Sequence, residues 1–229
     1  EALKVNLEMT QILADEANRS GAMLIFFSTD YVFPGDKRGE LEENDEPKPL
    51  NFYGETKFRA EKYIQQVSLQ YVIFRITWLY GIYGKSFPRT ILERAKNQKK
   101  FDIVADQIGR PTYTKDVAGV MRKLLLNQTF EKKINTVYHL GNQDSVSWAD
   151  FAEFILKQAG HEDARVNRIT SDVLNRPAKR PANSVLCLNK IKTELNIEVR
   201  SWKQAVSDFV HEFQKQDAAA WAVTIFFSL

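Results

Sequence analysis

The feature that most constrains the fold is an uninterrupted apolar run at residues 22–27, which leads into the hydroxyl pair Ser28 and Thr29. Because such a run has no polar face, it predicts a strand buried on both sides, as in parallel sheets that are covered by helices. Open parallel sheets bind ligands in the crevice beyond the carboxyl ends of their strands. We therefore expect Ser28 and Thr29 to face a ligand-binding crevice.

Helical and strand patterns alternate along most of the chain. Helices are predicted over residues 5–20, 54–66, 87–97 and 115–126, and strands over residues 22–27, 71–76, 101–104 and 137–140. This alternation is typical of an α/β fold with a parallel sheet.

After residue 142 the pattern changes. Ser147 with Asp150, and Ser201 with Gln204, resemble capping boxes that begin two more helices. We expect residues 1–142 to form a Rossmann-like, doubly wound domain with an excursion at about 81–112. Residues 143–217 are expected to form a small α+β substrate-binding domain.

The segment Tyr53-Gly54-Glu55-Thr56-Lys57 opens a predicted helix. Its four-residue spacing places Tyr53 and Lys57 on one face, one turn apart. A nearby ammonium favours a phenolate and lowers the tyrosine pKa from about 10. The spacing alone also fits a surface tyrosine beside a solvated lysine. Its combination with the strand-end hydroxyls instead indicates a proton-transfer site in which Lys57 lowers the Tyr53 pKa.

Five segments in order resemble the extended short-chain dehydrogenase/reductases, and within them the dTDP-4-dehydrorhamnose reductase family. They are residues 28–33, 49–57, 75–81, 106–112 and 180–186, and the match runs from about residue 5 to about residue 213. The resemblance implies reduction of dTDP-4-dehydro-L-rhamnose to dTDP-L-rhamnose, a step of nucleotide-sugar biosynthesis for surface polysaccharide. NADPH is the implied hydride donor, with NADH left open.

The resemblance also implies roles for individual residues. Thr29, with Ser28 beside it, would position the C4 carbonyl, and Tyr53 would donate the proton to the new alkoxide. Lys57 would hold the cofactor ribose. The resemblance implies cofactor contacts by both Tyr53 and Lys57.

Aromatic and basic residues complete the implied substrate site. Its contacts would be Ser28, Thr29, Asp30, Tyr31 and Trp78, with the Trp78 indole lying along the deoxysugar. A strand-end tryptophan can equally well be a packing anchor. The loop that carries Arg176, Lys179 and Arg180 fits a contact to the nucleotide diphosphate and fits a solvated loop equally well.

Two alternatives come from related sequence classes. A sugar-nucleotide epimerase or dehydratase would share the Tyr-Lys pair but would retain its cofactor through a cycle. A regulatory subunit resembling the β subunit of methionine adenosyltransferase would bind without catalysis, and Trp78 argues against it.

The glycine-rich turn by which the family binds the NADPH pyrophosphate has no counterpart in this sequence. The resemblance implies that the sequence starts, at Glu1, inside a crossover helix. We expect a chain that lacks the first βαβ part of the fold and is inactive alone. The apolar segment 218–229 is predicted to follow the last helix, with an unknown role. It is too short to span a bilayer, and it could pack on the body, lie on a membrane surface or be foreign to the native protein.

Composition narrows the partners. The chain has 229 residues, 44% of them hydrophobic, and a net charge of +3. Its lysine clusters, residues 96–100 and 132–133, lack interleaved aromatics, which excludes a nucleic-acid interface. Cys187 fits a buried small hydrophobe, and His139, His161 and His211 show no metal-ligand spacing. We expect a cytoplasmic, metal-free protein whose partner is a nucleotide sugar; a homodimer is compatible with the sequence.

Overall fold

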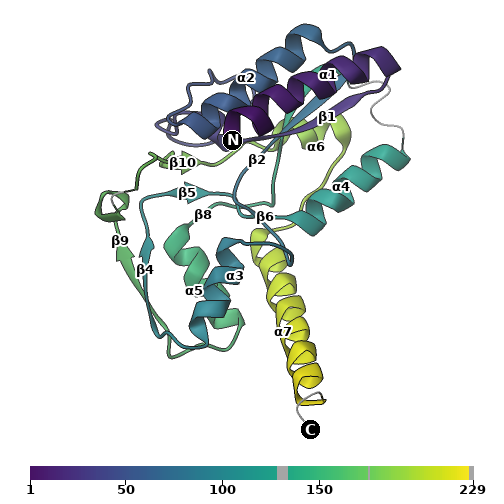
Figure 1. Cartoon of the computed structure of the whole chain (residues 1–229). Coiled ribbons are helices and arrows are strands. Elements are labelled where there is room, and N and C mark those ends of the chain that lie inside the picture. The colour runs from purple at the N-terminus through teal and green to yellow at the C-terminus, as the bar shows by residue number, and fades with distance from the viewer. Residues whose placement is uncertain (128–133, 175, 227–229) are drawn as a thin grey trace.

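A three-stranded parallel sheet forms the centre of the molecule's larger lobe (Figure 1). The computed structural model describes residues 1–127, 134–174 and 176–226, with side chains described as far as residue 217. The strands β1 (Leu24–Thr29), β2 (Tyr71–Ile76) and β7 (Thr136–Leu140) lie in the order β1-β2-β7. The predicted α/β class with a parallel sheet is confirmed. The strand predicted at 22–27 starts two residues later, so Ser28 and Thr29 are its last residues.

Helices cover both faces of this sheet. One face carries α1 (Met9–Ser20), which follows the π-helical turn η1 (Lys4–Glu8), and α2 (Phe52–Val67). The other face carries α4 (Thr114–Leu126) and α6 (Asn189–Leu195). We call this assembly the sheet lobe.

The burial of β2 shows why its sequence is apolar apart from Arg75. Tyr71 and Ile73 pack in the core beneath α1 and α2, whereas Val72, Phe74 and Ile76 pack in the core beneath α4 and α6. Both sets are buried. A strand with helices on both faces has no solvent side on which a polar residue would be favourable.

A second lobe, the helix lobe, contains α3 (Phe87–Ala95), α5 (Trp148–Gln158) and α7 (Trp202–Phe226). Helix α5 contacts α3, α7 and the parallel pair of strands β4 (Lys100–Val104) and β9 (Arg165–Ile169). Its core includes Ile91, Phe101, Phe151, Ile155 and Phe209. Helix α7 runs well past the predicted end at Phe213, so residues 218–226 are helical. Residues 227–229 lie outside the described part.

Short strands join the two lobes. β3 (Leu79–Tyr80) pairs with β6 (Thr112–Tyr113). β5 (Ile108–Gly109) lies between β8 (Val146–Ser147) and β10 (Asn183–Ser184). The 3-10 turns η2 (Asp30–Val32) and η4 (Ser171–Leu174) follow β1 and β9. Residues far apart in sequence therefore meet beyond the carboxyl end of β1.

The predicted cap at Ser147 is confirmed, but the capping box differs from the prediction. The Ser147 hydroxyl accepts a hydrogen bond from the Asp150 N–H at 3.1 Å. The Asp150 carboxylate bonds the Ser147 hydroxyl and the Arg168 guanidinium. The carboxylate therefore links α5 to β9.

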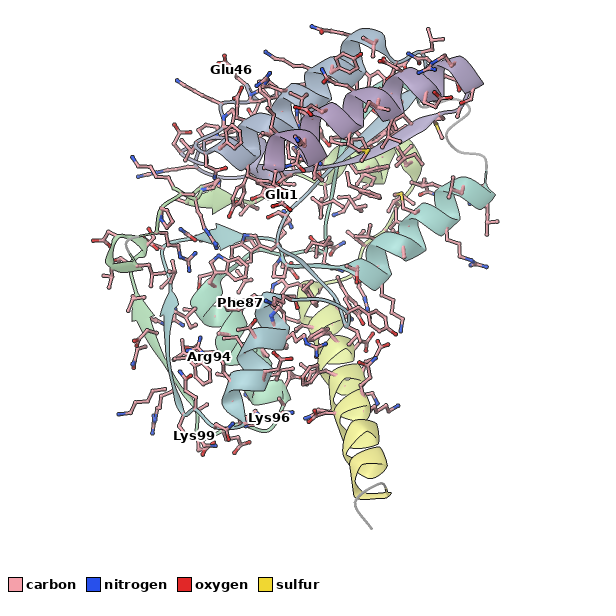
Figure 2. All side chains as sticks on the ribbon, viewed as in Figure 1. Glu1, Glu46, Phe87, Arg94, Lys96 and Lys99 are labelled. Atoms are coloured by element: carbon pink, nitrogen blue, oxygen red, sulfur yellow. The ribbon has the colours of Figure 1, made fainter. Side chains whose placement is uncertain are left out.

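Two lysines of the predicted cluster 96–100 are paired with acids. Lys96 lies beyond the end of α3 opposite to Phe87 (Figure 2) and forms an ion pair with Asp217, while Lys99 pairs with Asp163. The second predicted lysine cluster, 132–133, lies outside the described residues. Within the described residues, no helix has the length and apolar character needed to cross a membrane.

Candidate active site

A cavity of about 520 Å³ opens at the carboxyl ends of β1 and β2. Most of the sequence-predicted site residues line it, namely Ser28, Thr29, Asp30, Tyr31, Tyr53 and Trp78. Lys57 lies on α2 one turn beyond Tyr53. The structure therefore brings the predicted site residues together at the edge of the sheet where parallel folds bind ligands.

Gly54 sets the position of Tyr53. The side chain of Asn51 caps α2 by accepting from the Gly54 N–H at 2.9 Å, which fixes the first turn. A Cβ on residue 54 would overlap the carbonyl oxygen of Tyr31, so only glycine lets α2 approach η2 this closely. As a result the Tyr31 and Tyr53 rings meet edge to face, with 5.7 Å between their centroids.

The environment of Tyr53 raises the pKa of its phenol. Burial is the main cause; the hydrogen bond with the Thr29 hydroxyl opposes it, and the Asp30 charge adds to it. The predicted lowering of this pKa by Lys57 is therefore wrong for this state of the protein. A raised pKa keeps the phenol protonated at neutral pH, which is the form that a proton donor needs.

Lys57 points away from the phenol. Its Nζ donates a hydrogen bond to the Phe27 carbonyl oxygen at 2.7 Å and lies 3.9 Å from the centroid of the Phe26 ring. Burial lowers the pKa of Lys57 to about 8, and the Glu61 carboxylate partly opposes this shift. The ammonium is thus anchored on β1, one turn along α2 from Tyr53.

Asp30 is a buried carboxyl group, with only 3% of its surface exposed. It accepts hydrogen bonds from the Thr29 hydroxyl at 3.2 Å and from the Ser184 hydroxyl. Burial raises the Asp30 pKa to about 6, although these hydrogen bonds oppose the shift. Ser184 lies in the segment 180–186 that the resemblance used, but nothing in that segment marked it as a partner of Asp30.

Trp78 lines the cavity as expected, and it stacks on Trp148. Sequence analysis considered only the neighbouring Ser147 as a cap and missed Trp148. Seventy residues separate the two indoles, and neither pattern nor spacing signals a contact between them.

Basic residues extend the cavity toward the helix lobe. Arg180 lines the 520 Å³ cavity and two neighbours of about 400 and 340 Å³, and Arg176 lines both neighbours. The third cavity also includes Phe87 and Arg94, which Figure 2 labels on α3. Among the described residues neither Arg176 nor Arg180 has a carboxylate partner, so both guanidinium groups are available to an anion.

The remaining candidate ligands form no metal site. In the ranges 1–127, 134–174 and 176–226 no group of three or more histidine, cysteine or acidic residues could hold a metal ion. Cys187 is buried, as predicted. His139 is buried as well, and burial together with Arg75 lowers its pKa to about 3, so it is neutral.

Most of the chain is similar to dTDP-4-dehydrorhamnose reductases. The family model described as RmlD substrate binding domain matches residues 1–215. The chain is 38% identical over 216 residues to a protein of Aggregatibacter actinomycetemcomitans named dTDP-4-dehydrorhamnose reductase. The match covers 90% of this chain and 72% of that relative.

Solved structures agree with this match. A dTDP-4-dehydrorhamnose reductase ortholog of Clostridium acetobutylicum superposes with a TM-score of 0.86 at 32% identity, covering 93% of this chain and 73% of that one. The Bacillus anthracis dTDP-4-dehydrorhamnose reductase, solved in complex with NADP, gives a TM-score of 0.81 at 31% identity. That superposition covers 90% of this chain and 72% of its chain. The resemblance found in the motifs is confirmed, and the chain belongs to the RmlD substrate binding domain family of dTDP-4-dehydrorhamnose reductases.

Proposed function

We propose that the protein reduces the C4 keto group of dTDP-4-dehydro-L-rhamnose, with NADPH as the hydride donor. The observation that carries this proposal is that Thr29 at the end of β1 and Tyr53 at the start of α2 line the same cavity, with Lys57 one turn further along α2. The names of the relatives support the substrate, and the NADP complex of the Bacillus anthracis relative supports the cofactor.

The residues present fit the nicotinamide half of the cofactor. The Lys57 ammonium has three N–H donors, of which one is used on the Phe27 carbonyl, so two can reach ribose hydroxyls. Tyr53 lies one turn away on α2, and its side chain lines the 520 Å³ cavity. When bound, the cofactor would supply the hydride that the carbonyl carbon receives.

Proton delivery would come from the protein. Negative charge develops on the C4 oxygen as its carbonyl is reduced, and a protonated phenol within hydrogen-bond reach can neutralise it. The raised pKa of Tyr53 keeps that proton in place before reaction. The single O–H of Thr29, which donates to Asp30 in this structure, would turn to the keto oxygen and hold it beside the phenol.

Substrate binding would use the rest of the cavity. The flat indole of Trp78 suits the C–H face of a deoxysugar, with Tyr31 as a second wall. Arg176 and Arg180 would hold the diphosphate, because planar guanidinium groups bind phosphate oxygens in a bidentate way. We include a cytoplasmic location in the proposal, because NADPH and nucleotide sugars are intracellular metabolites.

The test uses a chimera. The part of the Clostridium acetobutylicum reductase that the match does not cover is joined to residues 1–229, and NADPH oxidation is followed with dTDP-4-dehydro-L-rhamnose. We expect turnover by the chimera, and a loss of about 10²-fold or more in its Tyr53→Phe variant. Residues 1–229 alone are expected to show none, because the sequence has no glycine-rich turn after a strand.

Two results would contradict the proposal. One is a folded chimera that binds NADPH but does not reduce the keto sugar. The other is a Tyr53→Phe chimera that turns over at the rate of the parent.

A further inference from the structure

We infer that Trp148 is a positioning residue, which holds the Trp78 indole in the orientation that the sugar meets. This inference rests on the proposed function, because it assumes that Trp78 contacts the sugar. It adds a residue from the helix lobe, 70 positions further along the chain, to a site otherwise built at the end of the parallel sheet.

The two indoles form an unusually close pair. Their ring centroids are 3.5 Å apart and their planes differ by 11°. Aromatic pairs in proteins usually have centroids about 4.5–7 Å apart. Both rings are partly buried and both line the 520 Å³ cavity. One face of Trp78 is therefore occupied by Trp148, and the sugar can use only the other face or the ring edge.

The backbone of Trp78 needs support from its surroundings. Its φ is +47°, in the left-handed region that is unfavourable for a bulky residue. The carbonyl of Trp78 accepts a hydrogen bond from the Thr112 N–H at 3.1 Å, which links β3 to the start of β6. The Trp78 side chain lies against Gly109. A Cβ on residue 109 would overlap the indole ring, so the glycine leaves room for the ring.

Trp148 and Gly109 are held by the same small sheet. Gly109 of β5 pairs with Val146 of β8, and β8 leads through the cap Ser147 directly into Trp148 at the start of α5. Gly109 and Trp148 therefore keep a fixed relation to each other. Trp78, in the connection between β2 and β3, packs against both, so this small sheet helps to set the plane of its indole.

Trp148 also lies where two cavities meet. It lines the 520 Å³ cavity together with Trp78, and the 340 Å³ cavity together with Arg176 and Arg180. Phe87 packs on it with 4.5 Å between centroids. A change at Trp148 would therefore alter the sugar platform beside the basic residues proposed for the diphosphate.

The experiment compares two ligands that differ by the sugar. Binding of dTDP-L-rhamnose and of dTDP to the full chain is measured by calorimetry for the wild type, Trp148→Ala, Trp148→Phe and Trp78→Ala. We expect Trp148→Ala to weaken dTDP-L-rhamnose binding about tenfold and dTDP binding less than about twofold. Trp148→Phe, which keeps a flat ring, should restore most of the affinity.

A double variant tests whether Trp148 acts through Trp78. In Trp78→Ala/Trp148→Ala the loss should equal that of Trp78→Ala alone, since a support has no effect once the supported ring is absent. Gly109→Ala pushes directly on the indole and should also weaken dTDP-L-rhamnose binding. Gly119→Ala is the matched control, because a Cβ there meets nothing within 4 Å.

Circular dichroism reports the stack itself, since two stacked indoles give an exciton couplet that either Trp→Ala variant should abolish. The inference is overturned if Trp78→Ala lowers the affinity for dTDP-L-rhamnose but Trp148→Ala does not. If Trp148→Ala then removes the couplet and lowers Tm, Trp148 has only a packing role. Additive losses in the double variant would also overturn the inference. If Trp78→Ala has no effect on binding, or the wild type binds neither ligand, the proposed function fails, and the inference fails with it.

Discussion

Gly54 at the start of α2 lies against the carbonyl oxygen of Tyr31 in η2, with no room between them for a side chain. This contact sets the distance between the helix that carries Tyr53 and the strand end that carries Thr29. The proposed chemistry needs both hydroxyls within reach of one keto oxygen. A small backbone displacement here should therefore lower the reaction rate even where it costs little stability.

We therefore expect Gly54→Ala to impair proton transfer. The added Cβ must push the first turn of α2 away from η2, which lengthens the contact between Tyr53 and Thr29. In the chimera, kcat should fall by about tenfold or more. Gly119→Ala, in the interior of α4 and free of close neighbours, is the control and should retain full activity. Equal activity of the two variants would show that the close approach has no catalytic role.

The lowered pKa of Lys57 can be measured on the chain itself. After reductive methylation with ¹³C-formaldehyde, one dimethyl-lysine signal should titrate near pH 8, and Lys57→Met should remove it. Since this pKa lies below the usual lysine value, the ammonium is lost as pH rises through about 8. In the chimera, KM for NADPH should rise over the same range. A set of lysine signals that all titrate above about pH 10 would contradict the burial argument.

The residues that line the cavity could be found from the sequence because they lie in a few short segments. β2 has the predicted bounds, and Thr29, Tyr53 and Lys57 come from two adjacent elements. The orientation of Lys57 could not be predicted, since it depends on contacts between α2 and the Phe27 carbonyl and Phe26 ring of strand β1.

Two other features were beyond sequence patterns for different reasons. The stack of Trp78 on Trp148 is a contact between lobes, which periodicity within a helix or strand does not report. The end of α7 was placed too early because the amphipathic pattern fades near Phe213. The alanines at 218–220 favour helix without an apolar face, and the helix continues through them.

Removing one partner of a buried ion pair should lower the free energy of unfolding strongly. The Arg75 guanidinium bonds both carboxylate oxygens of Glu61, with its shortest contact at 2.7 Å, and the two side chains are 4% and 1% exposed. Glu61→Leu leaves a buried, unpaired cation and should cost about 3–5 kcal/mol of unfolding free energy.

Removing both charges should be far less costly than removing one. The double variant Glu61→Leu/Arg75→Met is expected to recover most of that loss in urea unfolding. Glu93→Gln, which breaks the exposed pair with Arg89, is the control and should change stability by less than about 1 kcal/mol. If the double variant is as unstable as Glu61→Leu, the loss comes from packing and not from the unpaired charge.

Asp30 should make stability depend on pH in a defined direction. Its pKa in the folded protein is about 6, above the ordinary value of 3.8. Between about pH 4 and pH 6 the folded state therefore binds more protons than the unfolded state, and the free energy of unfolding falls as pH rises through that window. Above pH 6 the free energy of unfolding that Asp30 ionisation removes is constant, at most about 3 kcal/mol.

Asp30→Asn removes this titration while keeping the shape of the side chain. The amide that the substitution introduces can accept from Thr29 and donate to Ser184, whose hydroxyl can turn to accept. We expect the variant to be more stable than the wild type at pH 7, with the difference shrinking toward zero near pH 4. Urea unfolding at several pH values measures that difference, and Asp163→Asn, at an exposed residue paired with Lys99, is the comparison. If the difference in unfolding free energy between the variant and the wild type stays constant from pH 4 to pH 7, the pKa of Asp30 is not raised by burial.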